Sequence, residues 1–200
     1  MSKEQRNCGG AGGCGHGAGG CSLPSPYPSL VQTIDEMQFE RGIWNAAIDG
    51  DVTRVEKFIR KGIHVDSEDT SGYTALHYAS RHGMIEVCKV LLMNGAEVDA
   101  RTRSGGVTSL QRAAYCGHVD IIRLLIAYKS NPLLQDNDGK TALHKAVERG
   151  RVDVARILVE QSPQLKLVKD KKGHRAESYV PDNCQSLLQI CSISSSVNQE

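Results

Sequence analysis

Cysteine and histidine side chains near the amino terminus are the first residues in this chain that could do chemistry. Cys8, Cys14, His16 and Cys21 fall within 14 residues, and thiolate sulfur and imidazole nitrogen can bind zinc tetrahedrally. Their spacing, C-x5-C-x-H-x4-C, matches no standard zinc module, and the glycines between them raise the entropy that metal binding must overcome. We therefore predict a disordered tail with exposed thiols and no cofactor. A zinc- or redox-responsive tail is the alternative.

Two histidines further along the chain could in principle act as general bases. His77 and His144 would each need a nucleophile such as Cys88 or Cys116, a cleft, and a third group that orients the base. Both cysteines occupy or adjoin apolar positions in helical patterns, where a thiol packs rather than reacts. We therefore predict that the chain has no catalytic residues and is not an enzyme.

An internal repeat supplies the elements that would position these side chains. Four glycines recur at intervals of 33, 34 and 33 residues: Gly50, Gly83, Gly117 and Gly150. Nine residues before the last three glycines stand the related tetrapeptides Thr74–His77, Thr108–Gln111 and Thr141–His144. Each glycine separates a short helical pattern from a longer amphipathic one, and a polar loop follows. A period of this length predicts stacked units that offer a binding surface rather than a pocket.

The repeat also resembles a known family. Residues 72–80, Gly83, residues 90–92 and residues 95–99, together with residues 136–144, resemble the ankyrin repeat, and the resemblance extends over about residues 41–192. It implies an all-α solenoid of helix-turn-helix units joined by short hairpin loops. It also implies that the loop tips and the first helices form a concave binding surface, here named the inner face. The departures from the family pattern are Gln111 for histidine, and Lys129 and Ser162 for glycine.

These patterns predict the organisation of the whole chain. Disordered tails are expected at residues 1–28 and 193–200, with a repeat domain at residues 29–192. Within it we expect a helical segment around residues 30–37, followed by five units. They are a partial first unit at 41–66, full units at 69–101, 102–135 and 136–168, and a degenerate capping unit at 170–192.

The resemblance implies a structural role for both histidines. In this kind of repeat the threonine and histidine side chains bond backbone groups across neighbouring loops. His77 and His144 are therefore expected to hold the stack together. Gln111 is expected to replace such a bond, because its amide both donates and accepts.

Exposed positions on the inner face are the candidate binding residues. Tyrosine and arginine are common interface anchors, and cations outnumber carboxylates in the predicted set. We therefore predict a protein–protein interaction adaptor whose partner presents an acidic or mixed-charge segment. The set is Tyr73, Arg81, His82, Arg103, Tyr115, Lys140, Glu148 and Arg149.

Composition restricts the remaining classes of function. The net charge of +1 gives no bulk attraction to nucleic acid, and no run of 18 apolar residues could span a membrane. The glycine-rich amino terminus is unlike a signal peptide. Seven cysteines, an odd number, favour reduced thiols in the cytoplasm, the nucleus or both. We expect a monomer.

Overall fold

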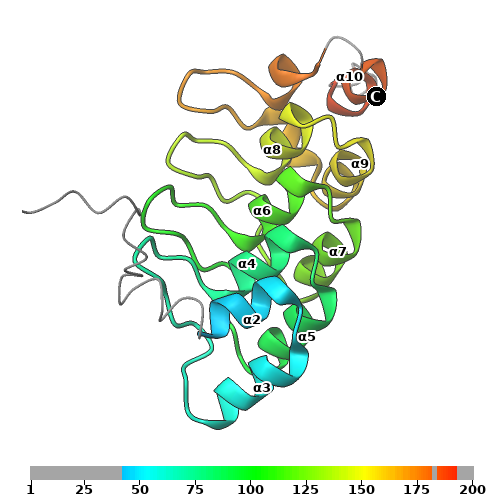
Figure 1. Ribbon diagram of the computed structural model, residues 1–200. Coiled ribbons are helices and arrows are strands. Elements are labelled where there is room, and N and C mark those ends of the chain that lie inside the picture. Colours follow the sequence, from blue (N-terminus) through cyan, green and yellow to red (C-terminus); the bar gives the residue numbers. More distant parts are fainter. Residues whose placement is uncertain (1–41, 182–183, 193–200) are drawn as a thin grey trace, which may run out of the picture. The chain divides into compact units, whose positions relative to one another are not determined.

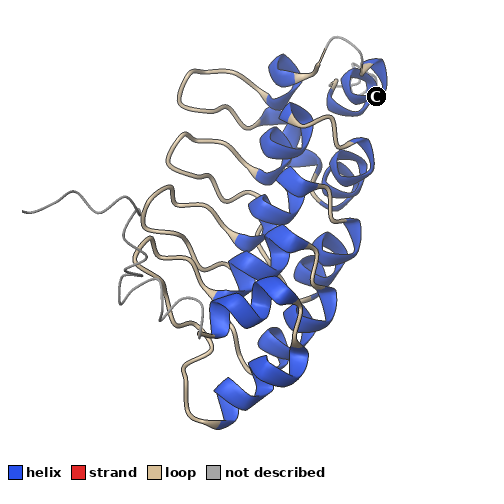
Figure 2. Ribbon diagram, viewed as in Figure 1, coloured by secondary structure: helices blue, strands red, loops and turns tan. Residues whose placement is uncertain are grey.

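The computed structural model describes residues 42–181 and 184–192. The cluster at Cys8–Cys21, the helix expected around residues 30–37 and the carboxy-terminal tail lie outside these ranges. Within them the structure is all-α, as predicted, and contains no strand (Figure 2). A single isolated bridge joins Lys169 to Arg175.

The helices alternate between two layers along the chain (Figure 1). The inner helices are α2 (Ile43–Asp49), α4 (Ala75–His82), α6 (Ser109–Cys116) and α8 (Ala142–Glu148). The outer helices are α3 (Val52–Arg60), α5 (Ile85–Met93), α7 (Val119–Ala127) and α9 (Val152–Gln161). Two short 3-10 helices follow, η1 (Pro163–Leu167) and η2 (Ala176–Tyr179), and α10 (Gln185–Cys191) completes the order.

Each inner helix packs against the inner helices before and after it, and each outer helix packs behind its own inner helix. One large aliphatic side chain from each inner helix is almost fully buried: Ile43, Leu76, Leu110 and Leu143. The outer helices contribute Leu91, Leu125 and Leu158 to the same core. Because every unit buries its apolar face against its neighbours, the core runs the length of the stack.

The repeat glycines serve both the backbone and the packing. Gly83 ends α4 with φ of 81°, in the left-handed region that disfavours a side chain. A Cβ at this position would also lie 2.8 Å from the His118 ring of the next unit. A Cβ at Gly50 would lie 2.8 Å from the Met84 sulfur, and a Cβ at Gly117 would lie 2.9 Å from the Arg151 side chain.

The outer helices end differently from unit to unit. After α5, Gly95 adopts φ of 84°, and Lys129 adopts φ of 67° after α7 even though it carries a side chain. A left-handed lysine costs about 1 kcal/mol more than glycine would. In the fourth unit Ser162 instead has φ of −146°, so α9 runs directly into η1 without the left-handed turn.

Candidate functional site

His77 joins the second unit to the third. Its Nδ1 accepts the Thr74 backbone N–H at 3.2 Å, so the proton is on Nε2, which donates to the Val107 carbonyl at 3.0 Å. The side chain is fully buried, and this burial lowers the pKa of His77 to about 4. The predicted structural role is confirmed, and the imidazole is neutral at physiological pH.

His144 repeats the arrangement between the fourth unit and the loop that follows it. Its Nδ1 accepts the Thr141 N–H at 3.2 Å, and Nε2 donates to the His174 carbonyl at 3.4 Å. Burial also lowers the pKa of His144.

Gln111 makes the equivalent connection between the third and fourth units without a titratable group. Its Oε1 accepts the Thr108 N–H at 3.1 Å. Its Nε2 donates to the Leu134 carbonyl at 2.9 Å and to the Lys140 carbonyl at 3.0 Å. The prediction that glutamine replaces histidine here is confirmed, and the amide donates two bonds where the His77 imidazole donates one.

The cysteines in the described ranges are free thiols. Cys88 is buried beside the Ser80 hydroxyl, and burial raises the pKa of its thiol to about 11. A thiol of this kind is a poor nucleophile at neutral pH. Residues 42–181 and 184–192 hold no group of three or more side chains able to bind a metal. The predicted Cys8–Cys21 cluster lies outside the described residues.

Four of the predicted binding residues lie at the carboxy-terminal ends of the inner helices. Arg81, His82, Tyr115 and Arg149 are all exposed there. The Arg149 guanidinium lies 4.6 Å from the centre of the Tyr115 ring, a cation–π contact between the third and fourth units. Partial burial, with Arg81 and His118 nearby, lowers the pKa of His82.

Of the other four predicted residues, Tyr73, Arg103 and Lys140 lie nearer the hairpin loops, and Glu148 is the last residue of α8. Lys140 donates to Glu148 at 2.9 Å and places its ammonium 4.4 Å from the Tyr179 ring centre. Arg103 pairs with Glu68 of the preceding unit at 2.6 Å. Tyr73 lies under the Arg112 guanidinium. The structure therefore forms two contacting pairs within the predicted set, Tyr115–Arg149 and Lys140–Glu148.

Four side chains that lie next to this set were not predicted from the sequence. Each is the fourth residue of an inner helix or of η2: Tyr78, Arg112, Lys145 and Tyr179. All four contact a hairpin loop. The repeat period could have identified them, because aligning the tetrapeptides places these residues at the same position of each repeat, here called one column.

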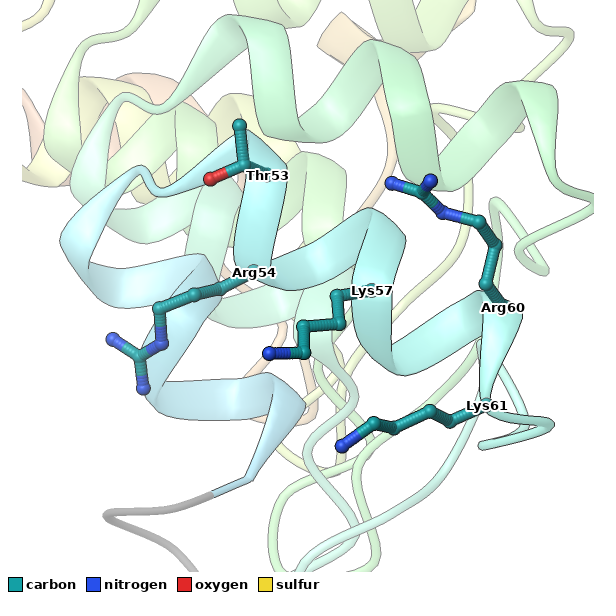
Figure 3. A pocket seen from close by; sticks show the side chains of 5 residues that line it. All are labelled: Thr53, Arg54, Lys57, Arg60 and Lys61. Carbon is teal, nitrogen blue, oxygen red and sulfur yellow. The ribbon is translucent and has the colours of Figure 1, made fainter.

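A second basic surface, also missed, covers α3. Thr53, Arg54, Lys57, Arg60 and Lys61 line an open hollow there (Figure 3). Arg54, Lys57 and Lys61 extend to one side of the helix, whereas Arg60 extends away from them (Figure 3). Asp49 neutralises Arg54 at 3.1 Å and Glu56 neutralises Arg60 at 3.2 Å, so half of the four cations are already paired.

Stacked helix pairs, each bonded to the next through its loop, define an α-helical repeat protein with an extended surface for binding. Residues 33–102 and 101–169 match the family described as ankyrin repeats (3 copies), and the chain belongs to the ankyrin repeat family. Ankyrin repeats indicate a protein–protein interaction domain.

Several curated proteins are similar to parts of the chain. Human ankyrin repeat domain-containing protein 39 is 52% identical over 82 residues, which is 41% of this chain and 45% of the relative. Its bovine counterpart is 57% identical over 63 residues, 32% of this chain and 34% of the relative. Bovine SMC5-SMC6 complex localization factor protein 1 is 33% identical over 118 residues, 56% of this chain and 11% of that protein. The match thus spans less than half the length of each of these relatives.

No helix in the described part of the chain is long and apolar enough to cross a membrane.

Proposed function

We propose that this chain is a non-catalytic adaptor that binds an acidic or mixed-charge segment of a protein partner through its inner face. The observation that supports this most directly is the Tyr115–Arg149 pair, an exposed ring and guanidinium that lie 4.6 Å apart. Aromatic and arginine side chains are the common anchors of protein interfaces. Arg81 adds an exposed cation one unit away.

The charge of the partner follows from the balance of this surface. Four of the eight proposed residues, Arg81, Arg103, Lys140 and Arg149, carry a cation, and Glu148 alone carries a carboxylate. Two cations are already paired, Arg103 with Glu68 and Lys140 with Glu148. The unpaired cations favour carboxylates on the partner, and the existing pairs can exchange with a segment of mixed charge.

Affinity capture from cell lysate tests this proposal. The intact chain is compared with an Arg81→Ala, Tyr115→Ala, Arg149→Ala triple variant that circular dichroism shows to be equally helical. The matched control removes Lys89, Arg123 and Arg156, one cation from each of the outer helices α5, α7 and α9.

Partners lost from the inner-face variant and retained by the outer-helix variant would support the proposal. An identical partner list for all three proteins would overturn it and direct attention to the tail with Cys8, Cys14, His16 and Cys21.

The proposal includes a place of action and a state of assembly. A monomer that works in the cytoplasm, the nucleus or both fits the near-zero net charge and the free thiols of the described residues. Light scattering on the purified chain tests whether it is a monomer, and imaging of a fluorescent fusion tests its location in the cell. A stable dimer, or a fusion confined to another compartment, would contradict it.

A further inference from the structure

Three hairpin loops are built around an aspartate at the base of the loop. The Asp69 Oδ1 accepts the backbone N–H groups of Ser71 and Tyr73, at 2.9 and 2.7 Å. Asp136 and Asp170 make the same two bonds to residues two and four positions later, at 2.8 to 2.9 Å. One carboxylate oxygen therefore shapes each loop.

The second oxygen of each aspartate is taken up by the side chain four residues into the inner helix or η2. The Tyr78 hydroxyl donates to Asp69 at 2.7 Å, and the Tyr179 hydroxyl donates to Asp170 at 2.5 Å. In the fourth unit the Lys145 ammonium pairs with Asp136 at 2.7 Å. Each of these carboxylates thus has its partner within the same unit.

The third unit breaks this pattern because Thr102 takes the place of the aspartate. The Thr102 hydroxyl accepts the Val107 N–H at 3.0 Å and is buried, so it shapes the loop as Asp69 does but brings no charge. The side chain in the column of Tyr78 and Lys145 is Arg112. Its guanidinium therefore has no loop aspartate in its own unit with which to form an ion pair.

Arg112 is left without a carboxylate. Among the described residues no acidic group lies within ion-pair distance of it, and its one side-chain bond runs from Nη2 to the Tyr73 hydroxyl. Its guanidinium carbon lies 5.0 Å from the Tyr73 ring centre, a cation–π contact that together with the hydroxyl bond restrains the group. Nε is buried without a partner, whereas Nη1 is neither buried nor bonded within the described ranges.

We propose that Arg112 is an anchor for one aspartate or glutamate side chain of a protein partner. The inference rests on the proposed function and deepens it, because it names the residue that recognises the acidic segment. The third unit keeps the cation and lacks the acid that sibling units supply at this place. A guanidinium held beside a ring and bonded to its hydroxyl is ordered in advance, so its remaining Nη1 can donate a charge-assisted hydrogen bond to a carboxylate.

A carboxylate fits this place better than a phosphate group. The fourth unit shows the chemistry that the position accepts, namely one carboxylate facing one cation, Asp136 with Lys145. Tyr78 is already bonded to Asp69 and Lys145 to Asp136, so Arg112 is the single uncompensated charge in its column. A phosphate with almost two charges needs more cations than this.

The substitution Thr102→Asp tests the assignment by restoring the missing acid. The matched control Thr102→Asn keeps a polar side chain of similar shape with no charge. The probe is a hexaglutamate peptide, with hexaglutamine as the uncharged comparison. Binding is followed by the nitrogen-15 resonance of the Arg112 Nε–H, which is assigned from its loss in Arg112→Lys.

Hexaglutamate should shift this resonance to saturation in the intact chain and in Thr102→Asn. In Thr102→Asp the affinity should fall about tenfold or more, the effect of losing one charge-assisted contact. Arg112→Gln has no Nε–H, so its binding is followed by the backbone amide resonances of the neighbouring loop; with unchanged circular dichroism it should lose the same affinity. Equal binding by Thr102→Asp and the intact chain, or a resonance that hexaglutamate leaves unmoved, would overturn the assignment.

Captured partners separate this inference from the proposed function. Partners lost from the Arg81, Tyr115, Arg149 triple variant but retained by Thr102→Asp would leave the adaptor function standing and reject Arg112 as its anchor. Partners retained by both variants would reject the adaptor function, and the hexaglutamate titration would still decide the chemistry of Arg112 alone.

Discussion

The second and third units have the same pair of helices but connect to their neighbours through different side chains. The second unit uses His77 to bond the next loop, and the third uses Gln111. The second unit ends its outer helix with Gly95, and the third ends it with Lys129 in the same left-handed conformation. These two units therefore share a donor, an acceptor and a positive φ, and more than one residue type can supply each.

The difference also separates two kinds of connection. A buried imidazole can take up a proton and a buried amide cannot, so the junctions made by His77 and His144 depend on pH whereas the junction made by Gln111 does not. Substitutions that exchange these residues test whether the two kinds of junction differ in stability and in pH dependence.

The largest effect is expected from His77→Ala. It leaves the buried Thr74 N–H without a partner, removes one of the two bonds to the Val107 carbonyl and opens a cavity, which should lower the free energy of unfolding by about 4 kcal/mol. His77→Gln, which copies the third unit, should lose about 1 kcal/mol. Urea denaturation followed by circular dichroism measures both. Equal losses would mean that the hydrogen bonds at this junction contribute little.

Acid should weaken the second unit's junction next. The folded-state pKa of His77, about 4, lies below its ordinary value of 6.5, so between these pH values the unfolded chain binds a proton that the folded chain does not. The stabilisation is complete above pH 6.5 and is lost as the pH falls toward 4, by about 3 kcal/mol in total. The pKa of His144 is lowered too, and its contribution has the same sign.

Urea midpoints at pH 7, 5 and 4 measure this loss, and His77→Gln is the control that isolates it. The variant should lose much less stability than the intact chain over the same range. A parallel decline in both proteins would assign the acid sensitivity to other groups.

A smaller gain is expected from Lys129→Gly. The left-handed conformation costs a side chain about 1 kcal/mol relative to glycine, and the substitution should raise the free energy of unfolding by about that amount. The reverse exchange, Gly95→Lys, should lower it equally, because a Cβ at Gly95 would meet no atom within 4 Å. If Lys129→Gly destabilises the chain instead, contacts of the lysine stem outweigh its backbone strain.

The smallest effect is expected from Arg149→Ala. An exposed cation–π contact contributes about 0.5 kcal/mol, so loss of the Tyr115–Arg149 pair should barely change the urea midpoint. Tyr115→Ala should behave alike. Because each single substitution already removes the contact, the double substitution should cost less than the sum of the two single ones, by about the energy of that contact. A loss above about 2 kcal/mol would show that the pair supports the stack rather than a partner.

The regular parts of the stack could be predicted from the sequence because they repeat. The glycine spacing located the helix pairs, and the tetrapeptides located His77, Gln111 and His144 at their junctions. These features need only local rules: a glycine where φ is positive and a side chain able to cap the inner helix.

Irregular features depend on contacts that the period does not encode. The Arg112–Tyr73 contact occurs in the unit where Thr102 replaces the aspartate and the hairpin is one residue longer. Both changes can be read in the sequence, but neither predicts the direction of the Arg112 guanidinium. The positive φ of Lys129 was equally hidden, because sequence reasoning expects glycine there. The continuation of α9 into η1 past Ser162 depends on packing of the last unit.

The glycines beneath neighbouring side chains give the stack a direction. Gly50, Gly83 and Gly117 each receive a side chain from the unit that follows, and Gly150 meets only the Cys184 sulfur, 3.7 Å from where a Cβ would stand. Growth by duplication is therefore asymmetric at the two ends. A unit added after the fourth could place a side chain over Gly150. A unit added before the first would need a glycine of its own, which Asp51 would cover because it holds the position that Met84 holds in the second unit.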